Sequence, residues 1–217
     1  SLDVLGALLG YGKSSRLYRS LVYDRQIARD VSVGNYSQEI AGEFHIQVTA
    51  SPGHSLNEVE DIVEEELDRV RQEPPDEREV QRAVNLIESH HVRQLEHAGG
   101  FGGRADQLNH YNVFAGDPGV INTDLDRYKA VGPSDVVRVA NSFLQAERVR
   151  LSVLPEEPAT VSQHANLLGQ GQVSIIHVLK EAVRHDRGAA GVCQRNGAGV
   201  RRDRLHGEAE RPRGRAR

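Results

Sequence analysis

The fold is set first by residues 5–21, which read LGALLGYGKSSRLYRSL. Residues 5–9 are apolar apart from one glycine, and Gly10 and Gly12 end this run. Ser14 and Ser15 follow, and a serine hydroxyl is a favourable cap for the start of a helix. The stretch therefore predicts a helix over residues 2–9 that is apolar on most sides, a tight glycine turn, and a second helix over residues 14–25.

Two segments after this stretch alternate between apolar and polar residues, which is the period of a half-buried strand. A polar turn around residues 37–42 separates them. The pattern predicts two strands that pair in the antiparallel direction. Their apolar members are Ile27, Val31 and Val33 in the first segment and Phe44, Ile46, Val48 and Ala50 in the second.

The middle of the chain is dominated by helical patterns. Residues 55–58 read SLNE, a capping box that predicts a helix over about residues 56–70. A long helix is expected after Pro74 and Pro75, with an apolar stripe from Val80 to Leu95. Shorter helices are expected over residues 104–112 and 124–130 and from Pro133, before a strand at residues 149–153. Strands and helices in separate runs predict an α+β fold, an antiparallel sheet with a helical layer on one face.

Composition divides the chain into two parts. Residues 1–164 carry 16 Lys and Arg against 26 Asp and Glu, whereas residues 165–217 carry 11 against 5. The periodic pattern ends near residue 158, so we expect a domain over 1–158 and a basic tail over 159–217. Residues 173–178 predict a short element within the tail, and residues 189–217 have the composition of a disordered segment. Whether residues 159–217 follow the native reading frame stays open.

The histidines of the long helix are the obvious candidates for a metal site. An inverted zinc motif places two histidines four residues apart in H-x-x-E-H. Residues 93–97 read RQLEH, so Arg93 stands where the first ligand should be. His90 and His97 share a helix face but are about 10 Å apart along the axis, too far for zinc–nitrogen bonds of about 2.0–2.1 Å. We therefore expect no metal ligand on this chain, with His91 near the core and His90 and His97 at the surface.

Two glycine-rich loops also fail as nucleotide sites. Gly99 to Gly103 and Gly10 to Ser15 lack both G-x-x-x-x-G-K-[ST] and G-x-G-x-x-G, and no strand precedes either loop. We interpret them as turns between helices. Cys193 is the only cysteine, so an internal disulfide is excluded, and its place in the tail disfavours a role as nucleophile.

Residues 5–21, residues 95–106, Tyr111 and the Gly116-Asp117-Pro118 segment together resemble the second, non-catalytic domain of an insulinase/pitrilysin-type zinc metallopeptidase, an inverzincin. The resemblance covers about residues 1–158. It implies a domain like those of the mitochondrial processing peptidase, in a protein whose halves close over a peptide. It also implies that zinc is held in a neighbouring domain or partner subunit, with no cofactor on this chain, and that at least one strand precedes Ser1.

One departure from the family pattern refines this expectation. Many family domains that face the active site carry an Arg and a Tyr seven residues apart, which grip the substrate backbone. The matching positions here hold Val22 and Arg29. The resemblance then implies the wall domain of the zinc-bearing half, and no catalytic, substrate-binding or metal-binding residue is carried over to this chain.

Three functions remain open on the sequence. The first is a non-catalytic, chamber-forming domain of a zinc-dependent peptidase, present as a fragment because the chain contains no methionine. The second is a non-enzymatic core or assembly subunit of the same fold. The third is a nucleic-acid binder with a basic tail, which is disfavoured because the tail lacks interleaved aromatic residues. No apolar stretch is long enough to span a bilayer, and periplasm and cytoplasm both stay open as compartments.

Overall fold

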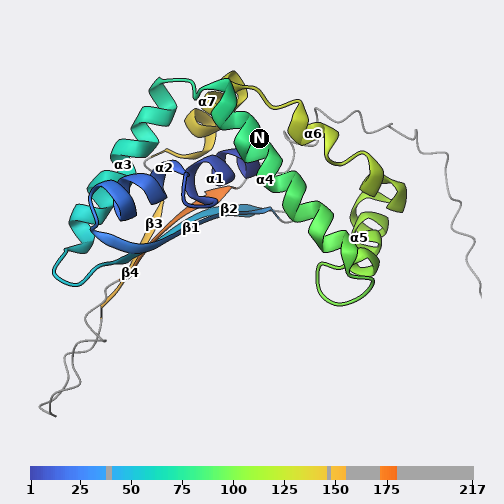
Figure 1. The fold of residues 1–217 in the computed structure, drawn as a ribbon, viewed down its shortest axis with the longest axis horizontal. Helices are drawn as coiled ribbons and strands as arrows, with labels where there is room; N and C mark the ends of the chain where they lie inside the picture. Colours follow the sequence, from blue (N-terminus) through green and yellow to red (C-terminus); the bar gives the residue numbers. More distant parts are fainter. Residues whose placement is uncertain (38–40, 146–147, 155–171, 180–217) are drawn as a thin grey trace, which may run out of the picture.

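The computed structural model describes residues 1–37, 41–145, 148–154 and 172–179. Within this part of the chain, four antiparallel strands form one sheet in the order β1-β2-β4-β3. The helices that pack on the sheet lie on one of its faces (Figure 1). The α+β class predicted from the sequence, an antiparallel sheet with a helical layer, is confirmed. The strands are β1 (Ala28–Ser37), β2 (Gly42–Ala50), β3 (Val149–Val153) and β4 (Gln172–Leu179).

The predicted antiparallel pair is formed by β1 and β2. Val31 pairs with Val48 and Val33 with Ile46, so the apolar members of both strands face the helices together. Their side chains are at most 5% exposed. An irregularity in register between Ala28 and Asp30 marks the start of β1.

β4 lies in the sheet between β2 and β3, although its residues fall within the predicted tail 159–217. Ile175 pairs with Ile46 of β2 and with Arg150 of β3. Val173 and Ile175 are buried in the common core. The short element predicted at residues 173–178 is therefore a strand that joins β3 to the rest of the sheet. The expected disorder of residues 189–217 lies outside the described residues.

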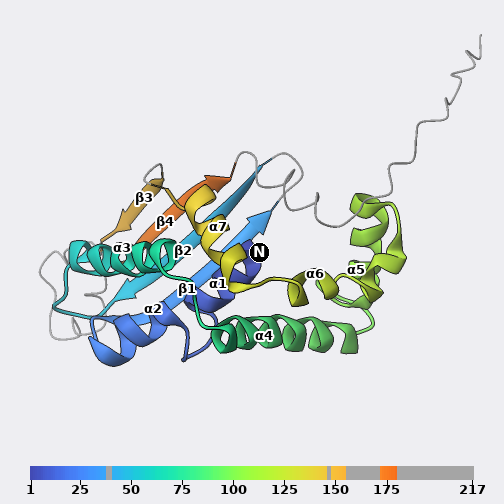
Figure 2. The same ribbon diagram turned by 90° about the horizontal axis from the view of Figure 1, so that it is seen from above.

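Four helical segments form the layer above the sheet. They are α1 (Leu2–Gly10), α2 (Arg16–Tyr18) with its π-helical continuation η1 (Arg19–Asp24), α3 (Leu56–Gln72) and α7 (Pro133–Phe143). The predicted capping box begins α3, where the Ser55 hydroxyl accepts a hydrogen bond from the Glu58 amide at 3.1 Å. A fifth helix, α4 (Glu77–Glu96), packs against α1 and extends beyond the sheet (Figure 2).

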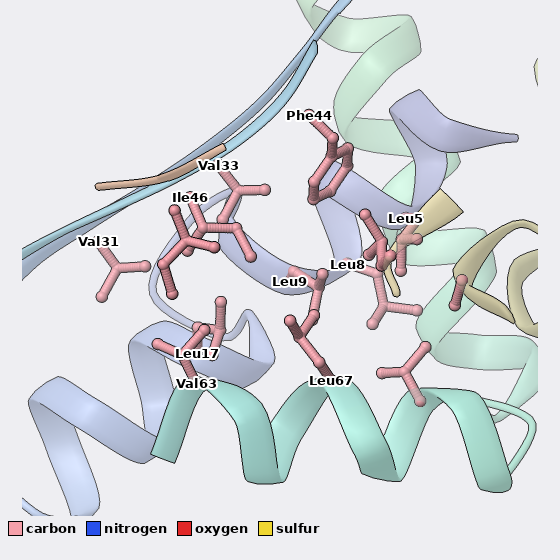
Figure 3. Close-up of a cluster of buried hydrophobic side chains, with 14 of the residues drawn as sticks. Leu5, Leu8, Leu9, Leu17, Val31, Val33, Phe44, Ile46, Val63 and Leu67 are labelled. Atoms are coloured by element: carbon pink, nitrogen blue, oxygen red, sulfur yellow. The ribbon is translucent and has the colours of Figure 1, made fainter. Parts of the chain in front are cut away.

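The hydrophobic core fills the space between the sheet and this layer (Figure 3). The first helix contributes Leu5, Leu8 and Leu9, and Leu9 lies next to Leu67 of α3. All three side chains are fully buried. Complete burial of one such side chain contributes about 1.5–3 kcal/mol, so these three leucines stabilise the packing of α1 in the core. The strand and helix partners shown with them are Leu17, Val31, Val33, Phe44, Ile46, Val63 and Leu67.

The second half of α4 and the segments that follow it project away from the sheet (Figures 1 and 2). We call residues 88–129 the arm. It contains α5 (Arg104–His110), the π-helical segment η2 (Tyr111–Ala115), the short η3 (Pro118–Asn122) and α6 (Asp126–Lys129). None of these four segments contributes a buried residue. The predicted helices at 104–112 and 124–130 are thus present, and only Tyr128 of α6 packs against the core.

Candidate functional site

The histidines of α4 do not converge. His90 is exposed, and its Nε2 atom lies 2.9 Å from Nε2 of Gln94, one turn further along the helix. His91 is half-buried, and His97 caps the exposed end of the helix. Glu88 is engaged in an ion pair with Lys129 at 3.0 Å. Within the described ranges, no three His, Cys, Asp or Glu side chains form a group that could hold a metal ion.

The glycine run after α4 forms a turn that its own polar groups complete. The amide of Gly102 donates to the carboxylate of Asp106 at 2.8 Å, and Gln107 donates to the Gly102 carbonyl at 3.0 Å. A side chain at Gly103 would collide with the Gly99 carbonyl oxygen at 2.4 Å. These contacts link α4 to α5, which matches the predicted role as a turn.

The other glycine loop has a similar structural role. The Ser15 hydroxyl donates to the Gly12 carbonyl at 2.8 Å, and Ser14 accepts a bond from Arg82 at 3.0 Å. Gly12 has a φ of +77°, where a glycine is favoured. The loop is therefore held between α1, α2 and α4.

Val22 and Arg29 stand where many domains of the family carry the substrate-gripping Arg and Tyr, and they lie in different surroundings. Val22 is half-buried and packs against the core, whereas Arg29 is exposed near the start of β1. Neither contributes to a described cavity. Cys193 lies outside the described residues.

The arm is held together by polar contacts and leaves apolar side chains exposed. Arg127 pairs with Asp124 at 2.6 Å and donates to the Tyr128 hydroxyl at 2.7 Å. Burial raises the pKa of Tyr111 and of Tyr128 above the ordinary value of a phenol. Phe101, Val113 and Phe114 are each more than half exposed. Side chains of this kind on a projecting segment are typical of a contact surface.

A second apolar surface lies on the face of the sheet opposite the helices, which we call the open sheet face. Val149, Leu151 and Val153 of β3 are 52%, 53% and 49% exposed. The residue between the first two, Arg150, reaches Glu60 of α3, so the three apolar side chains face the other way. Ile176 of β4 pairs with Val149 and extends this surface. Figure 1 shows no described helix covering this face.

One known protein family matches the first part of this chain. Residues 1–87 match the family model of the peptidase M16 inactive domain. The resemblance to a non-catalytic domain of this peptidase family, drawn from the sequence, is thus confirmed over these residues. No curated protein matches the chain.

Among solved structures, the chain is similar to a protease from Helicobacter pylori, with a TM-score of 0.58 and 21% sequence identity. The similarity covers 66% of this chain and 34% of that one. At this identity the likeness supports the fold alone. The chain matches about a third of the length of the solved protease.

Proposed function

We propose that this chain is a wall-forming, non-catalytic domain of a zinc-dependent endopeptidase. The match of residues 1–87 to the M16 inactive domain is the observation that carries the proposal. The M16 domain would supply surface and support, while the zinc-bearing active site would lie in a neighbouring domain of the same protein or in a partner subunit. The substrate of the whole enzyme would be a peptide.

The residues that the structure describes do not fit a zinc ion. Arg93 occupies the first ligand position of the nearest H-x-x-E-H alignment, and a guanidinium stays protonated and has no lone pair to donate. Glu88 forms an ion pair with Lys129 at 3.0 Å. We therefore assign no chemical step to these side chains.

Two exposed apolar surfaces support a role in a larger assembly. The arm presents Phe101, Val113 and Phe114, and the open sheet face presents Leu151 with its neighbours in β3. In the proposal the arm contacts another domain, and the open sheet face lines the peptide chamber. The alternative, a non-enzymatic assembly subunit of the same fold, would use the same surfaces without a zinc partner.

The genomic segments on both sides of this chain provide the test. A domain with an H-x-x-E-H motif encoded next to it should be co-expressed with the full chain, and hydrolysis of a fluorogenic peptide measured. We expect activity only when both are present, and none when the motif Glu is changed to Gln. A stable complex without activity would favour the assembly subunit. Activity of the zinc-bearing domain that is unchanged by this chain would contradict the proposal.

The nucleic-acid alternative has a separate test. Deletion of residues 180–217 removes all 11 Lys and Arg residues that follow β4, from Lys180 to Arg217, and leaves the strand itself intact. If the tail bound nucleic acid, RNA or DNA binding would vanish in this variant. We expect no binding by either form at physiological salt, about 0.15 M.

A further inference from the structure

The returning end of the arm meets the body at α6. Tyr128 packs against the core, and within the described ranges it is the only residue from α5 to α6 that does so. Nζ of the neighbouring Lys129 lies 3.0 Å from Oε1 of Glu88 in α4, so an ion pair joins the two ends of the arm. Figures 1 and 2 show α6 between the helical layer and the projecting α5. The contacts at α6 therefore close the base of the arm.

Arg127 holds the side chains at this base in place. Its Nε atom lies 2.6 Å from the Asp124 carboxylate, and one Nη atom donates to the Tyr128 hydroxyl at 2.7 Å. The guanidinium carbon lies 4.4 Å from the centre of the Tyr128 ring, within the range of a cation–π contact. We call Glu88, Asp124, Arg127, Tyr128 and Lys129 the clasp.

The clasp also interacts with the first helix of the body. Burial of the Tyr128 ring, together with the negative charge of Asp3 in α1, raises the pKa of the phenol. Asp3 is itself bound to the sheet, because the Asn35 side-chain amide donates to its carboxylate at 2.9 Å. The clasp therefore lies within electrostatic reach of α1.

Beyond the clasp, the arm has few contacts that would hold it to the body. α5, η2, η3 and α6 contribute no buried residue, and α4 contributes none after Val84. Segments with few buried apolar contacts open locally at a lower free energy than the core of the same protein. The side chains of Lys129 and Glu88 are 50% and 38% exposed, so salt in the solvent screens the attraction between them.

We propose that the arm is a strap that opens from the body as a unit, while the sheet and its helical layer stay folded, and that the clasp holds it closed. Opening separates Tyr128 from the core and Lys129 from Glu88, and it moves Phe101 and Phe114 relative to the body. High ionic strength favours the open form because it weakens the ion pairs of the clasp. The inference rests on contacts within this chain and does not depend on the proposed role in proteolysis.

Hydrogen–deuterium exchange of the full chain, followed by mass spectrometry, tests the strap. We expect amides of residues 104–129 to exchange roughly tenfold faster than those of β2, but more slowly than in an unfolded peptide. Lys129→Gln should speed exchange of the arm about two- to fivefold, the effect of losing one surface ion pair. Arg127→Gln loses contacts with both Asp124 and Tyr128 and should speed it further. Neither variant should change exchange in β2.

Arg104→Gln is the matched control, since Arg104 is an exposed arginine of the arm outside the clasp. This variant should exchange as the original chain does. Sodium chloride at about 1 M should speed exchange of the arm in the original chain, and less so in Lys129→Gln, because the screened pair is already absent.

Three results would overturn the strap. Equal exchange rates in the arm and in β2 would show that the arm does not open separately. Equal acceleration in Arg104→Gln and Lys129→Gln would show that the clasp has no special role. Acceleration of β2 by Lys129→Gln to the same extent as the arm would show that this ion pair stabilises the whole domain instead.

Discussion

Gly10 allows α1 to lie directly against β1. A Cβ atom at this position would be 2.4 Å from Cγ2 and 2.6 Å from Cβ of Val33, which is itself buried. Gly10→Ala should therefore lower the free energy of unfolding by about 1–3 kcal/mol through overpacking. Chemical denaturation followed by circular dichroism measures the change.

The matched control for this substitution is Gly99→Ala. A Cβ atom at Gly99 would meet no other atom within 4 Å, and the φ of this residue is outside the region that favours glycine. The control should change stability by less than about 0.5 kcal/mol. A Gly10→Ala variant as stable as the control would show that the contact between α1 and β1 is looser than described.

The sequence correctly predicted the burial or exposure of residues that follow a local apolar pattern. It did not predict contacts between residues that are distant in the sequence. The burial of Leu5, Leu8 and Leu9 followed from an apolar run, and the exposure of His90 from the helical period. The ion pair between Arg16 and Glu79 was not predicted, because these residues are 63 positions apart in the sequence and only the structure shows that they are neighbours.

At the scale of one element, the start of α7 has a cap whose contribution to stability depends on pH. Its Asp135 carboxylate accepts a hydrogen bond from the Gly132 amide at 3.1 Å. This backbone bond, aided by Arg138, lowers the pKa of Asp135 below its ordinary value of 3.8. A lowered carboxyl pKa contributes stability that is complete above the ordinary value and is lost as the pH falls through the folded-state pKa.

Asp135→Asn should therefore reduce stability at pH 7 by roughly 0.5–1 kcal/mol, the range for a helix cap. The difference between the variant and the original chain should shrink as the pH is lowered through the ordinary value of 3.8 and then through the lowered pKa of Asp135. Urea denaturation at a series of pH values gives this difference directly. A difference that stays constant or grows on acidification would contradict the assigned cap.

The sheet also depends on one late element. β4 is bonded to β2 on one side and to β3 on the other, with Val173 and Ile175 in the core. A chain ending at residue 179 should keep the stability of the full chain, whereas one ending at residue 158 should lose cooperative unfolding. Thermal unfolding followed by far-ultraviolet circular dichroism compares the two. Equal stability of both truncated chains would show that β4 does not hold β3 to the sheet.

The helices and strands that were predicted correctly each have a recognisable local sequence pattern. α3 begins at the capping box formed by Ser55 and Glu58. In β1 and β2, apolar and polar residues alternate over enough positions to show which side of each strand faces the core. β4 is harder to place from the sequence because its partner β2 is far away in the sequence, as in the pair Ile46–Ile175. The pairing of two strands that are distant in the sequence cannot be predicted from the residue pattern of either strand alone.

At the scale of the whole molecule, the fold separates a packed body from an arm without a core. In the body, α1, α3 and the sheet enclose the buried cluster, whereas α5, η2, η3 and α6 contribute no buried residue. No described helix is long and apolar enough to cross a membrane. The arm and the open sheet face are the surfaces through which the proposed wall domain would act.

The central claim is that this chain contributes structure and no catalytic metal. The direct measurement is elemental analysis of the full chain after dialysis against zinc at equimolar concentration and then against metal-free buffer, combined with a fluorogenic peptide assay. We expect far less than one zinc per chain and no hydrolysis above the buffer rate, and His97→Ala should change neither value. One zinc per chain, with hydrolysis abolished by His97→Ala, would contradict the account.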